Sequence, residues 1–150
     1  AGNRMVRKVM LSTNFVTRVA GIFSNFVPSL NVDGTPALNA SFNYPYFLDV
    51  HPTSGDIYLW CDLENKLRLI SAADSKVYTA AGSGTYADSG DGGSATSASL
   101  KDVRSVKIAA SQNRVYLGIT AGPSSPSPTP SPSSCPAMST CTRWARKSNR

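Results

Sequence analysis

An internal repeat constrains this chain more than any other feature of its sequence. Residues 33–37 (DGTPA) align with residues 91–95 (DGGSA) at an offset of 58, and the alignment continues from 58–59 to 116–117. A second register, with an offset of 61, places the Ala-Gly pair at residue 20 over the pair at residue 81. A three-residue length change in the loop after this pair reconciles the two offsets. Long periods of this kind indicate solenoids or propellers, because one repeat cannot bury its apolar face alone.

Each repeat is predicted to contain four short strands. In the complete copy these are residues 46–51 (YFLDVH), 56–61 (DIYLWC), 66–70 (KLRLI) and 76–81 (KVYTAA). The segments are rich in aromatic and β-branched residues or alternate between polar and apolar, and turn residues separate them. The first 120 residues contain no convincing apolar stripe of helical period. The sequence therefore predicts an all-β fold in which each repeat is one four-stranded antiparallel blade of a β-propeller.

The repeat is incomplete at both ends. The chain starts at a third strand, residues 5–10, and it enters a Pro/Ser tract after the second strand of the last repeat. The inventory is two trailing strands, one full blade and two leading strands, which cannot close a ring and would leave strand edges unpaired. We therefore expect a partial propeller, a fragment of a larger chain. The remaining blades would come from a longer chain or from self-association.

Residues 77–84 (VYTAAGSG) and 88–100 (DSGDGGSATSASL), together with 16–21 (VTRVAG) one repeat earlier, resemble the long form of the NHL repeat. The resemblance covers about 120 of the 150 residues and recurs in register. It implies a propeller of roughly six four-stranded blades. Its implications for activity are few, because propellers of this family serve many unrelated roles. The chain departs from the family pattern at residues 101–103 (KDV), where a proline is usual.

A glycine-rich connection between the fourth strand of one blade and the first strand of the next has a structural role in this interpretation. Glycine permits positive φ and close backbone approach, and aspartate can bond a neighbouring amide. Neither of the common phosphate-loop motifs is present, and no helix follows to aim its N-terminus at an anion. The predicted structural residues are Asp33, Gly34, Gly90, Asp91, Gly92 and Gly93.

The distributions of charged and of apolar residues argue against a nucleic-acid partner and against a membrane span. The chain has 15 Lys and Arg against 9 Asp and Glu, and much of the resulting net charge of +6 lies near its two ends. A nucleic-acid-binding surface would cluster cations with interleaved aromatic residues, so we expect no nucleic-acid partner. No run of about 18 apolar residues exists, so we expect no membrane span.

Composition divides the chain at residue 121. We expect residues 1–120 to form the NHL-like fragment and residues 121–150 to form a disordered stalk, because six of the ten prolines lie in 123–136. Ser/Thr/Pro tracts of this kind resemble O-glycosylated stalks, although a plain linker is equally compatible. Cys135 and Cys141 could form a disulfide or begin a further cysteine-rich module, and Asn39 begins a glycosylation sequon. Together these features favour an extracellular, secreted protein.

Residues capable of catalysis or metal binding are scarce. His51 is the sole histidine, without a second histidine or a carboxylate cluster at ligand spacing, and is expected beside a turn. Cys61 lies in an apolar strand and is expected to be a buried structural thiol. The aromatic residues Tyr58, Trp60, Tyr78 and Tyr116 are expected in the blade core. We therefore predict no catalytic residue, no metal site and no cofactor.

The sequence is most consistent with a non-catalytic scaffold that recognises a protein or a glycan through loops at one end of the propeller channel. Two alternatives remain open at this stage. One is a fragment of a metal-dependent propeller enzyme of the lyase or lactonase type, which would need ligands converging from several blades. The other is a structural component of the extracellular matrix, which the Pro/Ser stalk favours.

Overall fold

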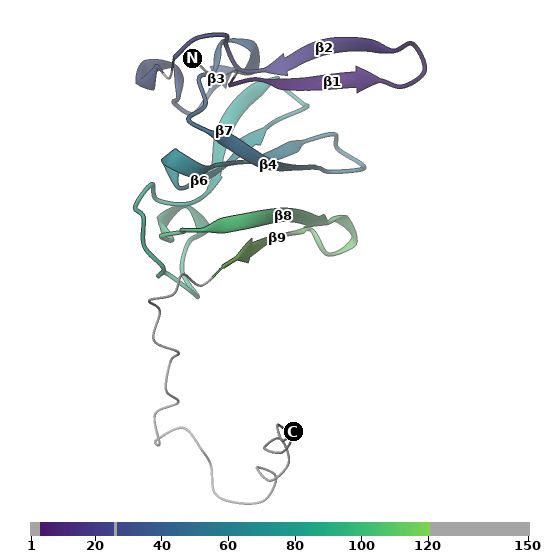
Figure 1. Ribbon diagram of the computed structural model, residues 1–150. Coiled ribbons are helices and arrows are strands. Elements are labelled where there is room, and N and C mark those ends of the chain that lie inside the picture. The colour runs from purple at the N-terminus through teal and green to yellow at the C-terminus, as the bar shows by residue number, and fades with distance from the viewer. Residues whose placement is uncertain (1–3, 26, 121–150) are drawn as a thin grey trace, which may run out of the picture.

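The computed structural model describes residues 4–25 and 27–120, which form an all-β fold of three antiparallel sheets (Figure 1). The predicted stalk, with Cys135 and Cys141, lies outside these residues. One hairpin contains β1 (Val6–Met10) and β2 (Phe15–Ala20), and another contains β8 (Val103–Ala109) and β9 (Arg114–Ile119). The five-stranded middle sheet has the order β3 (Thr35–Pro36), β7 (Lys76–Ala81), β6 (Lys66–Ile70), β5 (Ile57–Cys61) and β4 (Pro45–Val50).

The predicted strands of the complete repeat are confirmed. Both β6 and β7 have the predicted bounds, and β4 and β5 differ from theirs by a single residue at one or both ends. The helices among the described residues are single 3₁₀ turns of three residues each. The short β3 was not predicted. It extends the outer edge of the middle sheet by pairing Thr35 with Val77 and Pro36 with Lys76.

The 58-residue offset is reproduced in the strand register. In the middle sheet Pro45 pairs with Cys61, and a bulge follows before Phe47 pairs with Trp60. In the last hairpin Val103 pairs with Ile119, and a bulge follows at the same position. An equivalent backbone hydrogen bond lies beside both pairs. The N–H of Asp62 donates to the carbonyl of Tyr44 at 2.9 Å, and the N–H of Thr120 donates to the carbonyl of Asp102 at 3.1 Å. The repeat is therefore a repeat of backbone geometry as well as of sequence.

The 61-residue offset is reproduced equally well. Val6 pairs with Ala20 and a bulge follows, while Leu67 pairs with Ala81 and a bulge follows there too. The turns match as well: Asn14 and Ser75 both have φ of +57°. The hairpin β1–β2 is therefore the structural equivalent of β6–β7, the second half of the middle sheet.

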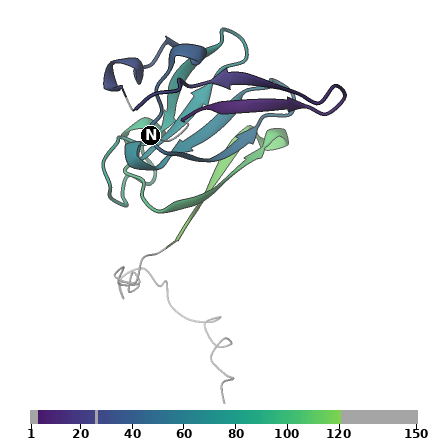
Figure 2. The same cartoon turned by 45° about the horizontal axis from the view of Figure 1, so that its top comes forward.

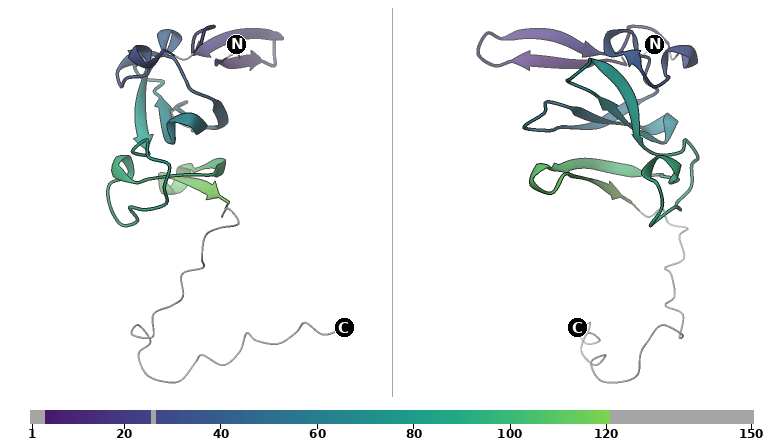
Figure 3. Two further views of the ribbon diagram at one scale, coloured as in Figure 1. Left: turned by 60° about the vertical axis from the view of Figure 1, so that its left-hand side comes forward. Right: turned by 180° about the vertical axis from the view of Figure 1, so that it is seen from behind.

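The three sheets follow one another in chain order, with each hairpin on one side of the middle sheet (Figures 1 and 3). Two apolar clusters lie between them. One includes Val6, Ala20, Phe42 and Leu59 and joins the first hairpin and its loop to the middle sheet. The other joins the middle sheet to the last hairpin through Trp60, Leu67, Val103 and Val106. Stacking of this kind buries the faces that a single repeat would leave in water.

The turns of the β1–β2, β4–β5 and β8–β9 hairpins point to one end of the stack, and the long connections gather at the other end with the β5–β6 turn (Figures 1 and 2). We call the second end the loop end; it comprises residues 21–25, 27–44, 62–65, 82–104 and 120. Among the described residues, no helix is long and apolar enough to cross a membrane.

Candidate binding surface

The first predicted connection is anchored by a buried charge. Asp33 Oδ1 lies 3.2 Å from Arg68 Nη2 and accepts a hydrogen bond of 2.9 Å from the Thr79 hydroxyl. Arg68 is only 1% exposed, so this carboxylate offsets part of the cost of burying a guanidinium. Gly34, at φ +85°, donates its N–H to the carbonyl of Val77 at 2.8 Å. These contacts hold the connection against β7, which supports a structural role for Asp33 and Gly34.

The second connection has the same backbone features but no such anchor. Gly90 is at φ +101°, where an added Cβ would come within 2.8 Å of Ala98 Cα. Gly92 is at φ +78°, and Gly93 N–H donates to Gly90 O at 3.1 Å. Asp91, the counterpart of Asp33, is exposed and has no hydrogen bond or ion pair within the described part of the chain.

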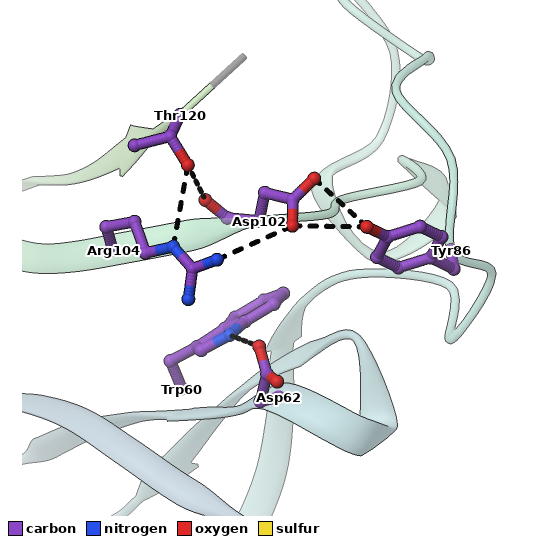
Figure 4. Close-up of polar contacts among 6 residues, drawn as sticks. All are labelled: Trp60, Asp62, Tyr86, Asp102, Arg104 and Thr120. Carbon is purple, nitrogen blue, oxygen red and sulfur yellow. Dashed lines mark hydrogen bonds and ion pairs between the residues drawn. The ribbon is translucent and has the colours of Figure 1, made fainter. Parts of the chain in front are cut away.

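A polar cluster at the loop end is centred on Asp102, and Figure 4 shows its members converging. The Tyr86 hydroxyl donates to both carboxylate oxygens, at 3.1 and 3.0 Å. Arg104 Nη2 lies 3.7 Å from the same carboxylate, and Arg104 Nε donates to the Thr120 hydroxyl at 3.5 Å. The hydrogen bond to Asp102 raises the pKa of Tyr86, because the carboxylate stabilises the protonated phenol. We call Tyr86, Asp102, Arg104 and Thr120 the Asp102 cluster.

A buried tryptophan lies in the same apolar cluster as Val103, which follows Asp102 in the chain. Trp60 is fully buried, and its indole N–H donates to Asp62 Oδ1 at 3.3 Å (Figure 4). Asp102 and Tyr44 occupy equivalent backbone sites, at φ +50° and +55°, but carry different side chains. The repeat thus presents an aromatic ring at one copy of the site and a carboxylate at the other. Both residues directly precede a strand, β4 for Tyr44 and β8 for Asp102.

Apolar side chains are exposed around this end of the molecule. Phe23 is 73% exposed, Leu63 58% and Tyr86 63%, and all three lie on loop-end connections. The Arg4 guanidinium lies 5.2 Å from the centroid of the Tyr44 ring, a cation–π contact. Exposed aromatic rings beside charged hydrogen-bonding groups are typical of interaction sites. Within the Asp102 cluster, Tyr86, Arg104 and Asp102 can therefore supply a stacking ring, a cation and an anion to one ligand.

The sequence-predicted chemistry candidates lie elsewhere or are structural. His51 Nδ1 accepts hydrogen bonds from the backbone N–H groups of Thr53 and Ser54, at 3.3 and 3.2 Å, so it stabilises the β4–β5 turn. Cys61 is fully buried, as predicted, and burial raises the pKa of its thiol well above the usual value. Asn39 has an exposed side chain at the end of a 3₁₀ turn. Within the described residues no three His, Cys, Asp or Glu side chains are grouped as metal ligands.

Sequence reasoning did not identify the Asp102 cluster. A signal was available, because residues 101–103 depart from the repeat pattern and Tyr44 is replaced by Asp102 in the second copy. Positions where two copies of a repeat share a backbone site but differ in polarity are candidates for function. Tyr116, expected in the core, is 51% exposed, because β9 has no third strand beside it among the described residues.

Comparison with known proteins gives a fold but no family. No family model and no curated protein matches the chain. Among solved structures it is similar to an auxiliary nutrient binding protein from Bacteroides thetaiotaomicron VPI-5482, with a TM-score of 0.51 and 18% sequence identity. The match covers 77% of this chain and 30% of that chain, so it spans less than a third of the neighbour's length. At this identity the likeness shows the all-β fold that the two chains share.

Proposed function

We propose that this chain is part of an NHL-like β-propeller that acts as a non-catalytic recognition scaffold, with the loop end as its binding surface. The two outer hairpins repeat the registers of the two halves of the middle sheet, which supports the propeller interpretation, because propellers are built from similar four-stranded blades. The glycine-rich connections, here Gly34 and Gly90 to Gly93, lead from each repeat into the next.

The observation that carries the proposed function is the Asp102 cluster. An exposed guanidinium, a carboxylate and the hydroxyl of Tyr86, a residue that is 63% exposed, converge there. Such a set offers donors, acceptors and a stacking surface, which together suit a polar peptide or a protein surface. A glycan could use the same groups and is the alternative ligand. The structural neighbour is described as a nutrient-binding protein, which is compatible with a binding role.

The proposal extends to the location of the protein. We propose that residues 1–120 form the propeller part and that residues 121–150 form a stalk outside the cell. The exposed sequon at Asn39 supports this location. Material secreted from eukaryotic cells should carry a glycan on Asn39, and peptide mapping should show Cys135 joined to Cys141. Free thiols at both cysteines on an unglycosylated chain would contradict the extracellular location.

The binding role is tested with arrays of extracellular protein ectodomains and of glycans, probed with the purified 150-residue chain. Ligands found in this way are then titrated against two variants of the loop end, Tyr86→Ala and Arg104→Ala. Each variant removes one group of the Asp102 cluster, and we expect each to weaken binding by about tenfold, the effect of one lost charge-assisted or aromatic contact.

The matched control is Lys107→Ala, which removes an exposed cation from the same strand as Arg104 but outside the Asp102 cluster. This variant should bind like the parent chain. Equal losses in all three variants, or no loss in either loop-end variant, would place the binding surface elsewhere. A hit on the glycan array with none on the protein array would select the glycan alternative.

A further inference from the structure

Two strand edges are left open in the described structure. Within these residues β1 pairs only with β2, and β9 pairs only with β8. The middle sheet shows what each edge lacks: β8–β9 has the register of β4–β5, and β1–β2 has the register of β6–β7. The two outer hairpins are therefore complementary halves of one four-stranded sheet. Open edges of this kind are templates for pairing with another chain.

Side chains at the open halves are apolar but exposed. Val9 is 55% exposed, whereas its equivalent in the middle sheet, Ile70, is 4% exposed. Ile119 is 41% exposed, whereas its equivalent, Cys61, is fully buried. Both outer positions keep apolar residues that the described fold does not bury. Exposed apolar positions of this kind mark surfaces that another element covers.

The charges around the open edges are complementary as well. In the middle sheet Arg68 is held by Asp33 from the preceding connection. The equivalent of Arg68 is Arg7, which lies opposite Arg18 across the β1–β2 pair, so two cations face each other. Within the described residues neither has an ion pair, and Asp91, the equivalent of Asp33, has none either. Completing the sheet would bring this unpaired carboxylate to these unpaired cations.

We propose that a second copy of this chain completes the sheet, with β9 of one copy pairing antiparallel with β1 of the next. The β5–β6 register of the middle sheet fixes the alignment. Tyr58 pairs there with Leu69 and Leu59 with Arg68, so Tyr116 pairs with Lys8 of the second copy and Leu117 with Arg7. Asp91 of the first copy then forms an ion pair with Arg7 of the second.

The contact is heterologous, because β9 and β1 are different surfaces, so assembly continues until a ring closes. Each copy contributes the equivalent of two blades, and propellers have about four to eight blades, so between about two and four copies close the ring. Ring closure rests on the propeller proposed above. The edge pairing itself depends only on the repeat register and on the exposed charges.

Cross-linking tests the register in the full 150-residue chain with Cys135 and Cys141 changed to Ser. Directly opposed residues on paired strands lie within disulfide range. The pair Tyr116→Cys and Lys8→Cys should therefore form intermolecular disulfides under mild oxidation. The control pair Lys107→Cys and Lys8→Cys places one cysteine on β8, one strand further away, and should not. Equal cross-linking of the two pairs, or none of the first, would overturn the proposed register.

Charge exchange tests the ion pair, with sedimentation of the 15.9 kDa chain as the readout. Arg7→Asp and Asp91→Arg, each alone, should weaken assembly by about tenfold, because each opposes like charges across the contact. The double variant should restore assembly toward that of the parent chain. The five described positions changed in the exchange and cross-link experiments are all exposed, so the variants should fold. A parent chain that sediments as a monomer at every concentration would overturn the proposal.

The outcomes of this test and of the binding test are separable. Tyr86→Ala and Arg104→Ala should leave assembly unchanged, because both residues lie at the loop end and not along the β9 edge. Loss of ligand binding with assembly intact would concern only the loop end. Loss of assembly in these two variants would contradict the separation of the two surfaces.

Discussion

Asp49 in β4 accepts a hydrogen bond of 2.9 Å from the backbone N–H of Ile108 in β8. The bond joins β4 and β8, the equivalent strands of two successive sheets, and Lys107 Nζ lies 3.6 Å from the same carboxylate oxygen. The residue at the equivalent position of the next repeat is Lys107, whose ammonium group cannot accept a hydrogen bond. This contact between the two sheets therefore depends on the sequence difference between the two copies. A polar bond thus adds to the apolar contacts that hold the sheets together.

Asp49→Ala should lower the free energy of unfolding by about 1–2 kcal/mol, because it removes a charged acceptor and leaves the Ile108 N–H unsatisfied. Urea unfolding followed by tryptophan fluorescence measures the change. Asp88→Ala is the control, since the exposed Asp88 has no hydrogen bond or ion pair within the described residues, and it should change stability by less than about 0.5 kcal/mol. Equal effects of the two substitutions would show that this contact does not stabilise the stack.

Stability should fall on acidification partly through the same carboxylate. The hydrogen bond from Ile108 is the main cause that lowers the pKa of Asp49 below its ordinary value. A carboxyl group whose pKa is lower in the folded protein than in the unfolded chain stabilises the fold. Its contribution is complete above the unfolded pKa of about 4, and it is lost as the pH falls through the folded pKa. Asp49→Asn should therefore flatten the stability curve below about pH 4. Parallel curves for the parent and the variant would contradict this assignment.

Gly82→Ala should destabilise the chain by more than about 2 kcal/mol. Gly82 is at φ +95°, and an added Cβ would collide with the carbonyl oxygen of Asn65 and approach Lys66 Cα at 3.0 Å. Gly34→Ala is the matched control: φ is +85° and nothing lies within 4 Å of the added Cβ, so only the backbone cost of about 1 kcal/mol applies. A smaller loss at Gly82 than at Gly34 would contradict the close packing of this turn.

The strand pattern could be predicted from the sequence, whereas the candidate binding surface could not. Alternation and the 58- and 61-residue offsets located β6 and β7 to the residue, because a strand's period of two ties side-chain type to sheet face. The two-residue β3 carries no such pattern. Its pairing with Val77 depends on where a distant connection comes to lie.

There is also a physical reason why the Asp102 cluster could not be predicted from the sequence. Tyr44 and Asp102 both adopt positive φ, although neither residue type favours it as glycine does. The Asp102 cluster joins Tyr86 from a loop to Arg104 and Thr120 on neighbouring strands, so no local spacing indicates it. The exposure of Tyr116 likewise depends on which strand lies beside it, and the residue alone does not determine that.

Cys61 should resist alkylation in the folded protein. The thiol is fully buried, and burial raises its pKa, so it stays protonated at neutral pH and offers little reactive thiolate. Iodoacetamide treatment at neutral pH, followed by peptide mass spectrometry, should leave Cys61 unmodified in native protein and modify it in urea. Rapid modification of native protein would mean that the β5–β6 core opens readily.

Amide hydrogen exchange as a function of concentration tests the central claim, that the outer hairpins are two halves of one repeat. Protection in β5 and β6 of the middle sheet should be strong at every concentration, because both edges of each strand are paired. Protection in β1 and β9 should be weak in dilute protein and should rise together as the protein is concentrated. Edge amides that stay unprotected in concentrated protein, or that gain protection in β1 without β9, would contradict the account.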